Sequence, residues 1–592
     1  MAALLGEDVR KINPRLRMIA NCSTEVNAFR AERSGYISVK ASPKLNALPV
    51  LRGSEPLALK LEQLSAEPQF PKLKGLAKDV YVNVFVETQD AGEAMPKALK
   101  GQATRANLIA ATVRLDQLPA IAGNRRVLNI ELGETLTMPT PDVAASNGQP
   151  EATRWRFGSA DDHGDGAGVL IGIIDVQGFD FAHPDFMDGD QTRFVRIWDQ
   201  GGAARPSPHQ QDPDRYGKEY NCGAEFRREH LNQAIRQAAQ LNLPPQEIER
   251  QSQMSPSSHA THVASIAAGN HGICRKALLA GVLIDLAEDA ADEQLRRQSF
   301  YDSTRIAQAV DYLLQVANEL KVPVSINISL GTNGSAHDGT AAISRWIDAA
   351  LTAPGRSICV AAGNAGQEVP VFPGDLGFVM GRIHTSGKVS DRYLSKDIQW
   401  SVIGNGWVDV SENELEIWYS EQDRFAVSVR PPFPDADWIG PVAPQEFIEN
   451  LPLPDGSLLS IYNELYHPSN GNNYIAVYLT PYFGEEAVIG IPAGNWTVRL
   501  HGLDVRDGRY HGWIERDDPR PLGRIGSMQA WRFPSFFSET SNVDDSSVGS
   551  MACGRRVIAV ANLHEAEERI NITSSQGPTR DNRYKPDVAA PG

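Results

Sequence analysis

Three side chains suited to acyl transfer lie at the ends of expected secondary-structure elements. Asp175 ends the apolar run GAGVLIGIID (166–175), His259 begins an apolar-periodic helix, and Asn364 ends the strand SICVAAGN. A carboxylate can hold an imidazole in one tautomer, the imidazole can move a proton, and an amide can stabilise a developing oxyanion. These are the groups that serine-dependent acyl transfer requires, but the nucleophile is not among them.

The order and context of these segments resemble the subtilisin-like serine proteases, the subtilases. IGIIDVQGFDFAHPDF resembles the aspartate motif of that family, SHATHVAS the histidine motif, NISLGT (327–332) the substrate-binding strand and VAAGN (360–364) the oxyanion asparagine. SSQGPTRDNRYKPDVAAPG (574–592) is similar to the segment that precedes the GTSMA nucleophile motif. RIWDQ (196–200), SLGTNGSAHDGT (329–340) and a long β-rich insertion narrow the resemblance to a branch that includes the clostridial Csp germination proteases.

The resemblance implies a serine endopeptidase made as a zymogen, which cleaves polypeptide substrates. Asp175 would be the orienting carboxylate, His259 the general base and Asn364 the oxyanion donor. The catalytic serine is expected in a missing C-terminal segment that follows Gly592, so this chain alone should be inactive. No cofactor is required, and a structural calcium ion is left open.

The same resemblance assigns substrate binding to Ser329, Leu330 and Gly331, which would offer a strand edge to an extended peptide. The sequence departs from the family at DVQG, one residue longer than the usual DTG, and at Ala260, which stands where the histidine motif has Gly. Because the chain lacks the serine, the alternative hypothesis is a catalytically inactive pseudoprotease that acts as a binding or regulatory module.

Two other arrangements of reactive residues are weaker. Ser550 lies in SVGSMAC, but this segment precedes RVIAVAN and KPDVAAPG, which the family's serine follows, so we reject Ser550 as the nucleophile. His259 and His262 form an HxxH pair without the intervening Glu or third ligand of a zinc hydrolase.

Strands alternate with helices around the candidate residues, which predicts an α/β fold with a doubly wound parallel sheet. We expect this subtilisin-like catalytic domain over 153–365 and, in truncated form, over 551–592. Short alternating strands predict an inserted all-β sandwich, resembling a jelly roll, over 366–550. An α+β domain over 76–134 resembles the subtilase propeptide and would occupy the cleft. Residues 135–152 form a linker, and residues 1–75 stay unassigned.

Composition excludes several classes of protein. The 592 residues carry 57 Lys and Arg against 73 Asp and Glu, a net charge of −16, so nucleic acid is not an expected partner. The longest apolar stretch, 277–284, is too short to cross a membrane, and no signal peptide is visible, so we expect a cytoplasmic protein. The five cysteines form no CxxC pair, which argues against a zinc site.

Overall fold

The structure is a computed structural model. It describes residues 10–20, 47–48, 57–58, 81–89, 99, 102–134, 136–137, 164–254, 258–284, 299–300, 303–366, 381–409, 411–483, 488–515, 520–525, 528–564 and 569–591.

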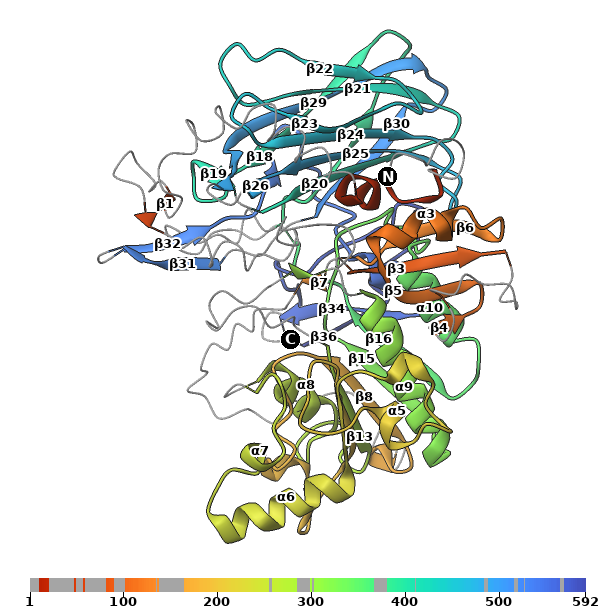
Figure 1. Cartoon of the computed structure of the whole chain (residues 1–592), viewed down its shortest axis with the longest axis vertical. Helices are drawn as coiled ribbons and strands as arrows, with labels where there is room; N and C mark the ends of the chain where they lie inside the picture. Colours follow the sequence, from red (N-terminus) through yellow and green to blue (C-terminus); the bar gives the residue numbers. More distant parts are fainter. Residues whose placement is uncertain are drawn as a thin grey trace.

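A mixed sheet is the centre of the lower half of the molecule in Figure 1. Its strand order is β12-β11-β13-β8-β15-β16-β34-β35, with β36 also paired to β34. All pairs are parallel except β11 with β12 and β34 with β35. The strands are β8 (Leu170–Asp175), β11 (Phe194–Asp199), β12 (Ala224–Arg227), β13 (Leu278–Leu283), β15 (Val324–Ile328), β16 (Arg356–Ala361), β34 (Ile558–His564), β35 (Arg569–Ile570) and β36 (Val588–Pro591).

Helices cover both faces of this sheet. The helices α9 (Ser303–Leu320) and α10 (Ala342–Ala350) share a hydrophobic core with Leu170 and Ile174 of β8. The helices α6 (Arg228–Leu241) and α8 (His259–Ala268) share another core with Ile171 and Ile173 of the same strand. Since successive side chains of a strand point to opposite faces, β8 is buried on both. The predicted α/β fold is confirmed.

A smaller antiparallel sheet, in the order β4-β5-β3-β6, packs against α9 and α10. We call it the small sheet. Its elements are β3 (Tyr81–Thr88), β4 (Ala103–Arg105), β5 (Leu108–Arg114), α3 (Leu118–Ala122) and β6 (Val127–Leu132). Phe85 and Leu108 contribute to the core around α9. Arg345 of α10 donates two hydrogen bonds of 2.8 Å to the Glu87 carboxylate, and Arg105 Nε donates to Asp311 of α9 at 2.9 Å.

Two further antiparallel sheets share one core at the top of Figure 1. One has the order β17-β30-β20-β25-β24-β23 and the other β22-β21-β29-β18-β33. Their strands are β17 (His384–Lys388), β18 (Ser395–Val402), β20 (Asn413–Tyr419), β21 (Arg424–Arg430), β22 (Ile439–Val442), β23 (Phe447–Pro452), β24 (Leu458–Glu464), β25 (Asn473–Thr480), β29 (Gly494–Asp504), β30 (Arg509–Glu515) and β33 (Phe536–Phe537). Buried Trp400 and Trp496, which face each other across β18 and β29, belong to this core. We call this unit the β sandwich.

The remaining elements are short. They are α5 (Pro208–Gln211), α7 (Pro245–Ile248), β1 (Ala47–Leu48), β2 (Leu57–Ala58), β7 (Leu136–Thr137), β9 (Met187–Asp188), β10 (Gln191–Thr192), β14 (Ser299–Phe300), β19 (Val408–Asp409), β26 (Tyr482–Phe483), β27 (Val488–Ile489), β28 (Ile491–Pro492), β31 (Arg520–Ile525), β32 (Met528–Arg532) and the 3₁₀ turns η3 (Leu115–Gln117), η4 (Gly164–Gly166), η5 (Pro184–Phe186), η6 (Lys218–Tyr220) and η8 (Ser550–Cys553).

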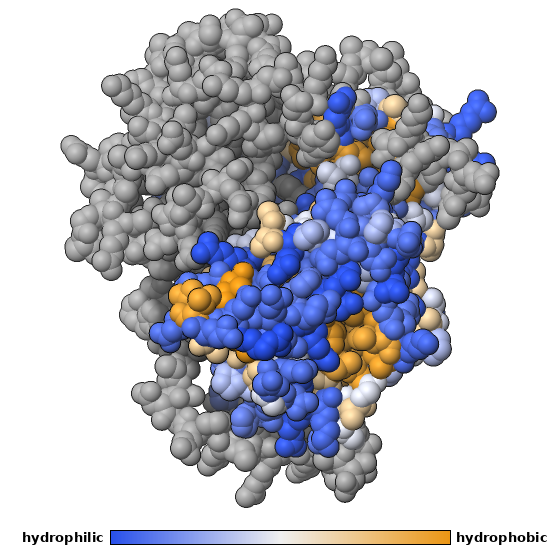
Figure 2. Space-filling model, turned by 60° about the horizontal axis from the view of Figure 1, so that its bottom comes forward, coloured by the Kyte–Doolittle hydropathy of each residue, from blue (hydrophilic) through white to orange (hydrophobic). Residues whose placement is uncertain are grey.

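Hydrophilic residues predominate among the coloured residues on the face shown in Figure 2, and the hydrophobic ones form separate patches. Among the residues that the structure describes, no helix has both the length and the hydropathy needed to cross a membrane.

Residues 10–20, part of the unassigned region 1–75, lie between the small sheet and the β sandwich. We call them the N-terminal strap. Ile12 forms a parallel bridge with Ile130 of β6, and residues 14–20 are helical. Leu16 is fully buried in a core that also contains Tyr478 of β25. Figure 1 shows the helical part of the strap directly beneath the β sandwich.

Buried Arg15 ties the strap to the β sandwich. Its guanidinium lies 2.8 Å from Glu412 and 2.8 Å from Glu515, and it also pairs with Glu414. Removing one member of a buried ion network leaves its partners charged and unpaired, which costs about 3–5 kcal/mol. We therefore expect Arg15→Ala to lower the free energy of unfolding by that amount, measured by urea denaturation followed by tryptophan fluorescence.

The exposed neighbour Arg10 provides the control for this prediction. Its described side-chain hydrogen bond, 3.3 Å to Gln445, is exposed, and exposed polar contacts contribute little. Arg10→Ala should therefore change the free energy of unfolding by less than about 1 kcal/mol. Equal effects of the two substitutions would show that the Arg15 network does not hold the strap.

Candidate functional site

Asp175 and His259 are in direct contact. The Nδ1 atom of His259 lies 2.8 Å from Oδ1 and 2.9 Å from Oδ2 of Asp175. Asp175 is fully buried at the carboxyl end of β8, and Oδ1 also accepts the Val176 backbone N–H at 2.7 Å. Burial raises the pKa of Asp175, and the contact with His259 and the Val176 amide oppose that shift. The contacts favour an ionised carboxylate and fix the orientation of the ring.

The position of His259 follows from the start of α8. His259 is the first residue of the helix, and Ser258 is the N-cap, whose Oγ accepts the Thr261 N–H at 3.1 Å. The Ser258 hydroxyl also donates to the Gly178 carbonyl at 2.7 Å, which fastens the helix start to the loop after β8. If Nδ1–H donates to Asp175, Nε2 carries the lone pair and can accept a proton. The pair can therefore act as a general base.

The other predicted site residues lie along the same edge of the sheet. The pairing register aligns Ile174 of β8 with Ile328 of β15, and Ile328 with Val360 of β16. Ser329–Gly331 directly follow β15, and Asn364 lies three residues beyond the end of β16. Asn364 is exposed, whereas Leu330 is buried. In α/β sheets, ligands bind at the carboxyl ends of strands, as this arrangement would allow.

A segment after the small sheet adds a strand next to α9. Leu136 and Thr137 (β7) pair antiparallel with Phe300 and Ser299 (β14). Leu136 is fully buried in the core around α9. The sequence predicts a linker over 135–152 and no strand there, because a strand of two residues leaves no periodic pattern. This backbone pairing resembles the pairing by which a bound peptide adds a strand to the edge of a sheet.

Glu134 anchors the start of this segment. Its backbone N–H donates to the Ser303 hydroxyl at 2.7 Å, and its carbonyl accepts the Ser303 N–H at 3.3 Å. Its carboxyl accepts from the Ser550 hydroxyl at 3.3 Å, and the second oxygen, Oε2, is buried without a hydrogen-bond partner. Burial raises the pKa of Glu134 to about 8. Sequence reasoning missed this residue, because its neighbours are distant along the chain.

Ser550, the rejected nucleophile, lies in η8. Its hydroxyl is 3.1 Å from that of Ser335 and contacts Glu134, and its backbone N–H donates to the Thr332 carbonyl at 2.8 Å. The serine is buried beside the loop that follows β15, with its hydroxyl engaged by these partners.

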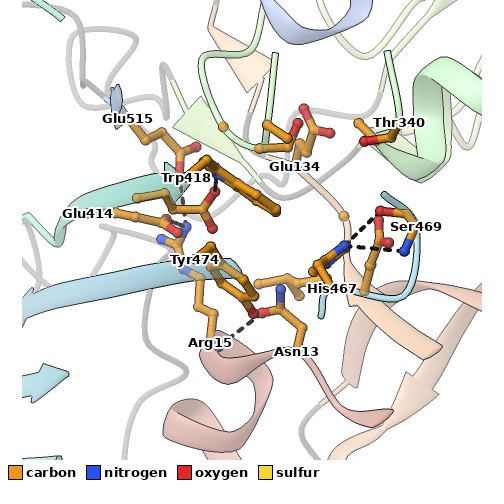
Figure 3. A pocket seen from close by; sticks show the side chains of 18 residues that line it. Asn13, Arg15, Glu134, Thr340, Glu414, Trp418, His467, Ser469, Tyr474 and Glu515 are labelled. Carbon is orange, nitrogen blue, oxygen red and sulfur yellow. Dashed lines mark hydrogen bonds and ion pairs between the residues drawn. The ribbon is translucent and has the colours of Figure 1, made fainter. Parts of the chain in front are cut away.

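A cavity of about 70 Å³ lies where four parts of the chain meet (Figure 3). These are the strap, the small sheet, the loop after β15 and the β sandwich. Trp418 and Tyr474 stack with ring centroids 4.7 Å apart, and Trp418 Nε1 donates to Glu416 at 3.1 Å. Burial raises the pKa of Glu416 to about 7. The lining residues are Asn13, Arg15, Glu131, Leu132, Gly133, Glu134, Gly334, Ser335, Ala336, Thr340, Ala341, Glu414, Glu416, Trp418, His467, Ser469, Tyr474 and Glu515. Neither Asp175 nor His259 lines this cavity.

Within the described ranges, no group of three or more His, Cys, Asp or Glu side chains could hold a metal ion. His262, the second histidine of the HxxH pair, is exposed. Asp185 of η5 contacts the Ser265 hydroxyl and lies 2.7 Å from Nδ1 of His271.

Comparison with known proteins places the geometry in context. Residues 166–407 match the model of the subtilase family. The solved structure of the CspB protease of Clostridium perfringens is similar with a TM-score of 0.53 and 21% identity, over 72% of this chain and 75% of that chain. The S41 psychrophilic protease aligns over 34% of this chain and 48% of its own, at 20% identity and a TM-score of 0.18. The search of curated proteins gave no match. The resemblance that the motifs predict is thus confirmed: residues 166–407 match the subtilase family, and the chain shares the fold of a Csp protease.

Proposed function

We propose that this protein is a subtilisin-like serine endopeptidase, in which Asp175 and His259 activate a serine from a segment that follows Gly592. The contact of His259 Nδ1 with both carboxylate oxygens of Asp175, at 2.8 and 2.9 Å, carries this proposal. The imidazole would take the serine proton as the hydroxyl attacks a peptide carbonyl, and Asn364 would donate to the oxyanion. Ser329–Gly331 would bind the substrate backbone.

The small sheet would act as a propeptide. Its ion pairs with α9 and α10 and the pairing of β7 with β14 support this assignment. Leu136 and Thr137 would occupy the part of the cleft that takes a substrate strand, and the protein would then be a zymogen. Release of this segment would be required before a polypeptide substrate could bind.

Serine-directed labelling tests the proposed function. The protein, extended by the residues that follow Gly592 in its gene, is treated with a fluorophosphonate, and the modified residue is located by mass spectrometry. We expect one labelled serine beyond residue 592 and loss of labelling after heat denaturation. Absence of labelling and of peptide hydrolysis in the folded, extended protein, with the small sheet removed from the cleft, would favour the pseudoprotease hypothesis.

The Glu134 carboxyl should make docking of the small sheet pH-dependent. Because its pKa is about 8 when folded, against 4.5 ordinarily, the folded protein keeps a proton that the unfolded chain releases above pH 4.5. Stability contributed by the protonated form is therefore lost progressively between pH 4.5 and 8. Glu134→Gln should remove this loss and stabilise the protein at pH 8.5 by up to about 5 kcal/mol, with little gain at pH 4.5.

Urea denaturation of the wild type and the variant at the two pH values measures this difference. Glu539, whose side chain is 83% exposed, supplies the control. Glu539→Gln should shift the free energy of unfolding by a similar small amount at both pH values. A gain for Glu134→Gln that is independent of pH would contradict the assigned protonation of Glu134.

A further inference from the structure

Gln177, in the DVQG segment that is one residue longer than the usual DTG, has an unusual backbone conformation. Its φ is 72°, in the left-handed region that bulky residues seldom adopt, and Gly178 follows with φ 89°. A Cβ on Gly178 would lie 2.2 Å from the Gln253 carbonyl oxygen, so the loop is held closely against residues 253–254. Glycine would adopt the conformation of residue 177 without strain, so the turn alone does not account for glutamine there.

The side chain of Gln177 contacts the first residue of α8. Its Oε1 accepts the backbone N–H of His259 at 2.9 Å. The backbone N–H of Gln177 donates to Oε1 of Gln253 at 3.0 Å, and Nε2 of Gln253 donates to the Ile284 carbonyl at 2.6 Å. The loop after β8, the first turn of α8 and the end of β13 are thus joined by two glutamine side chains.

This contact supplies an acceptor that the helix lacks. The first N–H groups of a helix have no partner within it, and His259 occupies the first position of α8. Ser258 Oγ satisfies the N–H of Thr261, and Gln177 satisfies that of His259 itself. Asp175 and Gln177 are two residues apart, so one short loop holds the His259 side chain through Asp175 and its backbone through Gln177.

We propose that Gln177 is a positioning residue that fixes the backbone of His259 relative to Asp175. The proposal rests on the proposed function, in which His259 is the general base. An error of about 1 Å in the placement of a reacting group can lower a rate by about 10²-fold.

Three substitutions separate positioning from turn formation. Gln177→Ala and Gln177→Gly both remove the acceptor, and the glycine also relieves the left-handed backbone. We expect both to lower kcat of the extended protease by about 10–100-fold with little change in KM. Gln177→Glu retains an acceptor oxygen and should keep most of kcat. A glycine variant with wild-type kcat would overturn the proposal.

Proton NMR of the 592-residue chain gives a second readout, which needs no activity. The Nδ1–H of His259, hydrogen bonded to a carboxylate, should give a low-field resonance, identified by its loss in His259→Ala. We expect this resonance to shift or broaden in Gln177→Ala and Gln177→Gly and to persist in Gln177→Glu. An unchanged resonance in all three would overturn the proposal.

Gln251 provides the matched control. Its side chain makes two hydrogen bonds of 2.8 Å to the backbone of Phe179 in the same loop, and its described contacts do not include α8. Gln251→Ala should loosen the loop but leave the His259 resonance in place, and an equal loss in both alanine variants would contradict specific positioning. If the resonance responds as expected but the extended protein hydrolyses no peptide, positioning stands and the proposed function fails.

Discussion

Replacing His259 by alanine is expected to lower kcat of the extended protease by about 10⁶-fold, the loss that follows removal of the histidine in subtilisin. The only described partner of the buried Asp175 carboxylate that can move a proton is this imidazole, at 2.8 Å. Without it, the serine hydroxyl would keep its proton during attack. The measurement is the hydrolysis rate of a peptide substrate at saturation, with active-site titration of each preparation.

His262 gives the control for this substitution. It lies in the same helix and is exposed. His262→Ala should leave kcat within about twofold of the wild type, because exposed positions away from the site have small effects on the fold. A His259→Ala protein that keeps a tenth or more of the wild-type rate would show that another group acts as the base.

Asp175→Asn should lower kcat by about 10⁴-fold while the protein stays folded. The asparagine has nearly the same shape, but its amide can donate to Nδ1 and so favour the wrong tautomer of His259. The lost transition-state stabilisation corresponds to about 5 kcal/mol. Steady-state kinetics measure the loss, and unchanged circular dichroism shows that the fold persists.

Asp188, an exposed residue of β9, is the matched control for the loss of a carboxylate. Asp188→Asn should retain nearly full activity. If Asp175→Asn lowered kcat by less than tenfold, the carboxylate would not orient the base. The contact with His259 would then be only structural.

The helices and strands of the domain that holds Asp175 and His259 could be predicted from the sequence. Each is marked by a pattern of apolar residues within its own length. The apolar period over 303–320 predicts a helix, and α9 has these bounds. The apolar run before Asp175 predicts a strand buried on both faces, as found for β8. In both cases the spacing of apolar residues within one element decides its structure. The predicted strand 324–329 runs one residue past the end of β15, and the predicted strand 357–362 is shifted by one residue from β16.

Contacts between distant segments could not be predicted in this way. The sequence shows only that DVQG has one residue more than the usual motif, and nothing near Gln177 shows that its side chain reaches His259. The strap has a short helical segment whose partners, such as Glu515, are far along the chain. The pairing of β7 with β14 joins two segments of two residues each, too short to show a period.

The Arg15 network also sets an order of events during synthesis. Arg15 and Glu515 are separated by 500 residues. At about 5–20 residues per second, a ribosome needs roughly 25–100 s to make that length of chain. The network can be completed only after β30 has emerged, so closing the top of the molecule over its own N-terminus belongs to the last stage of folding.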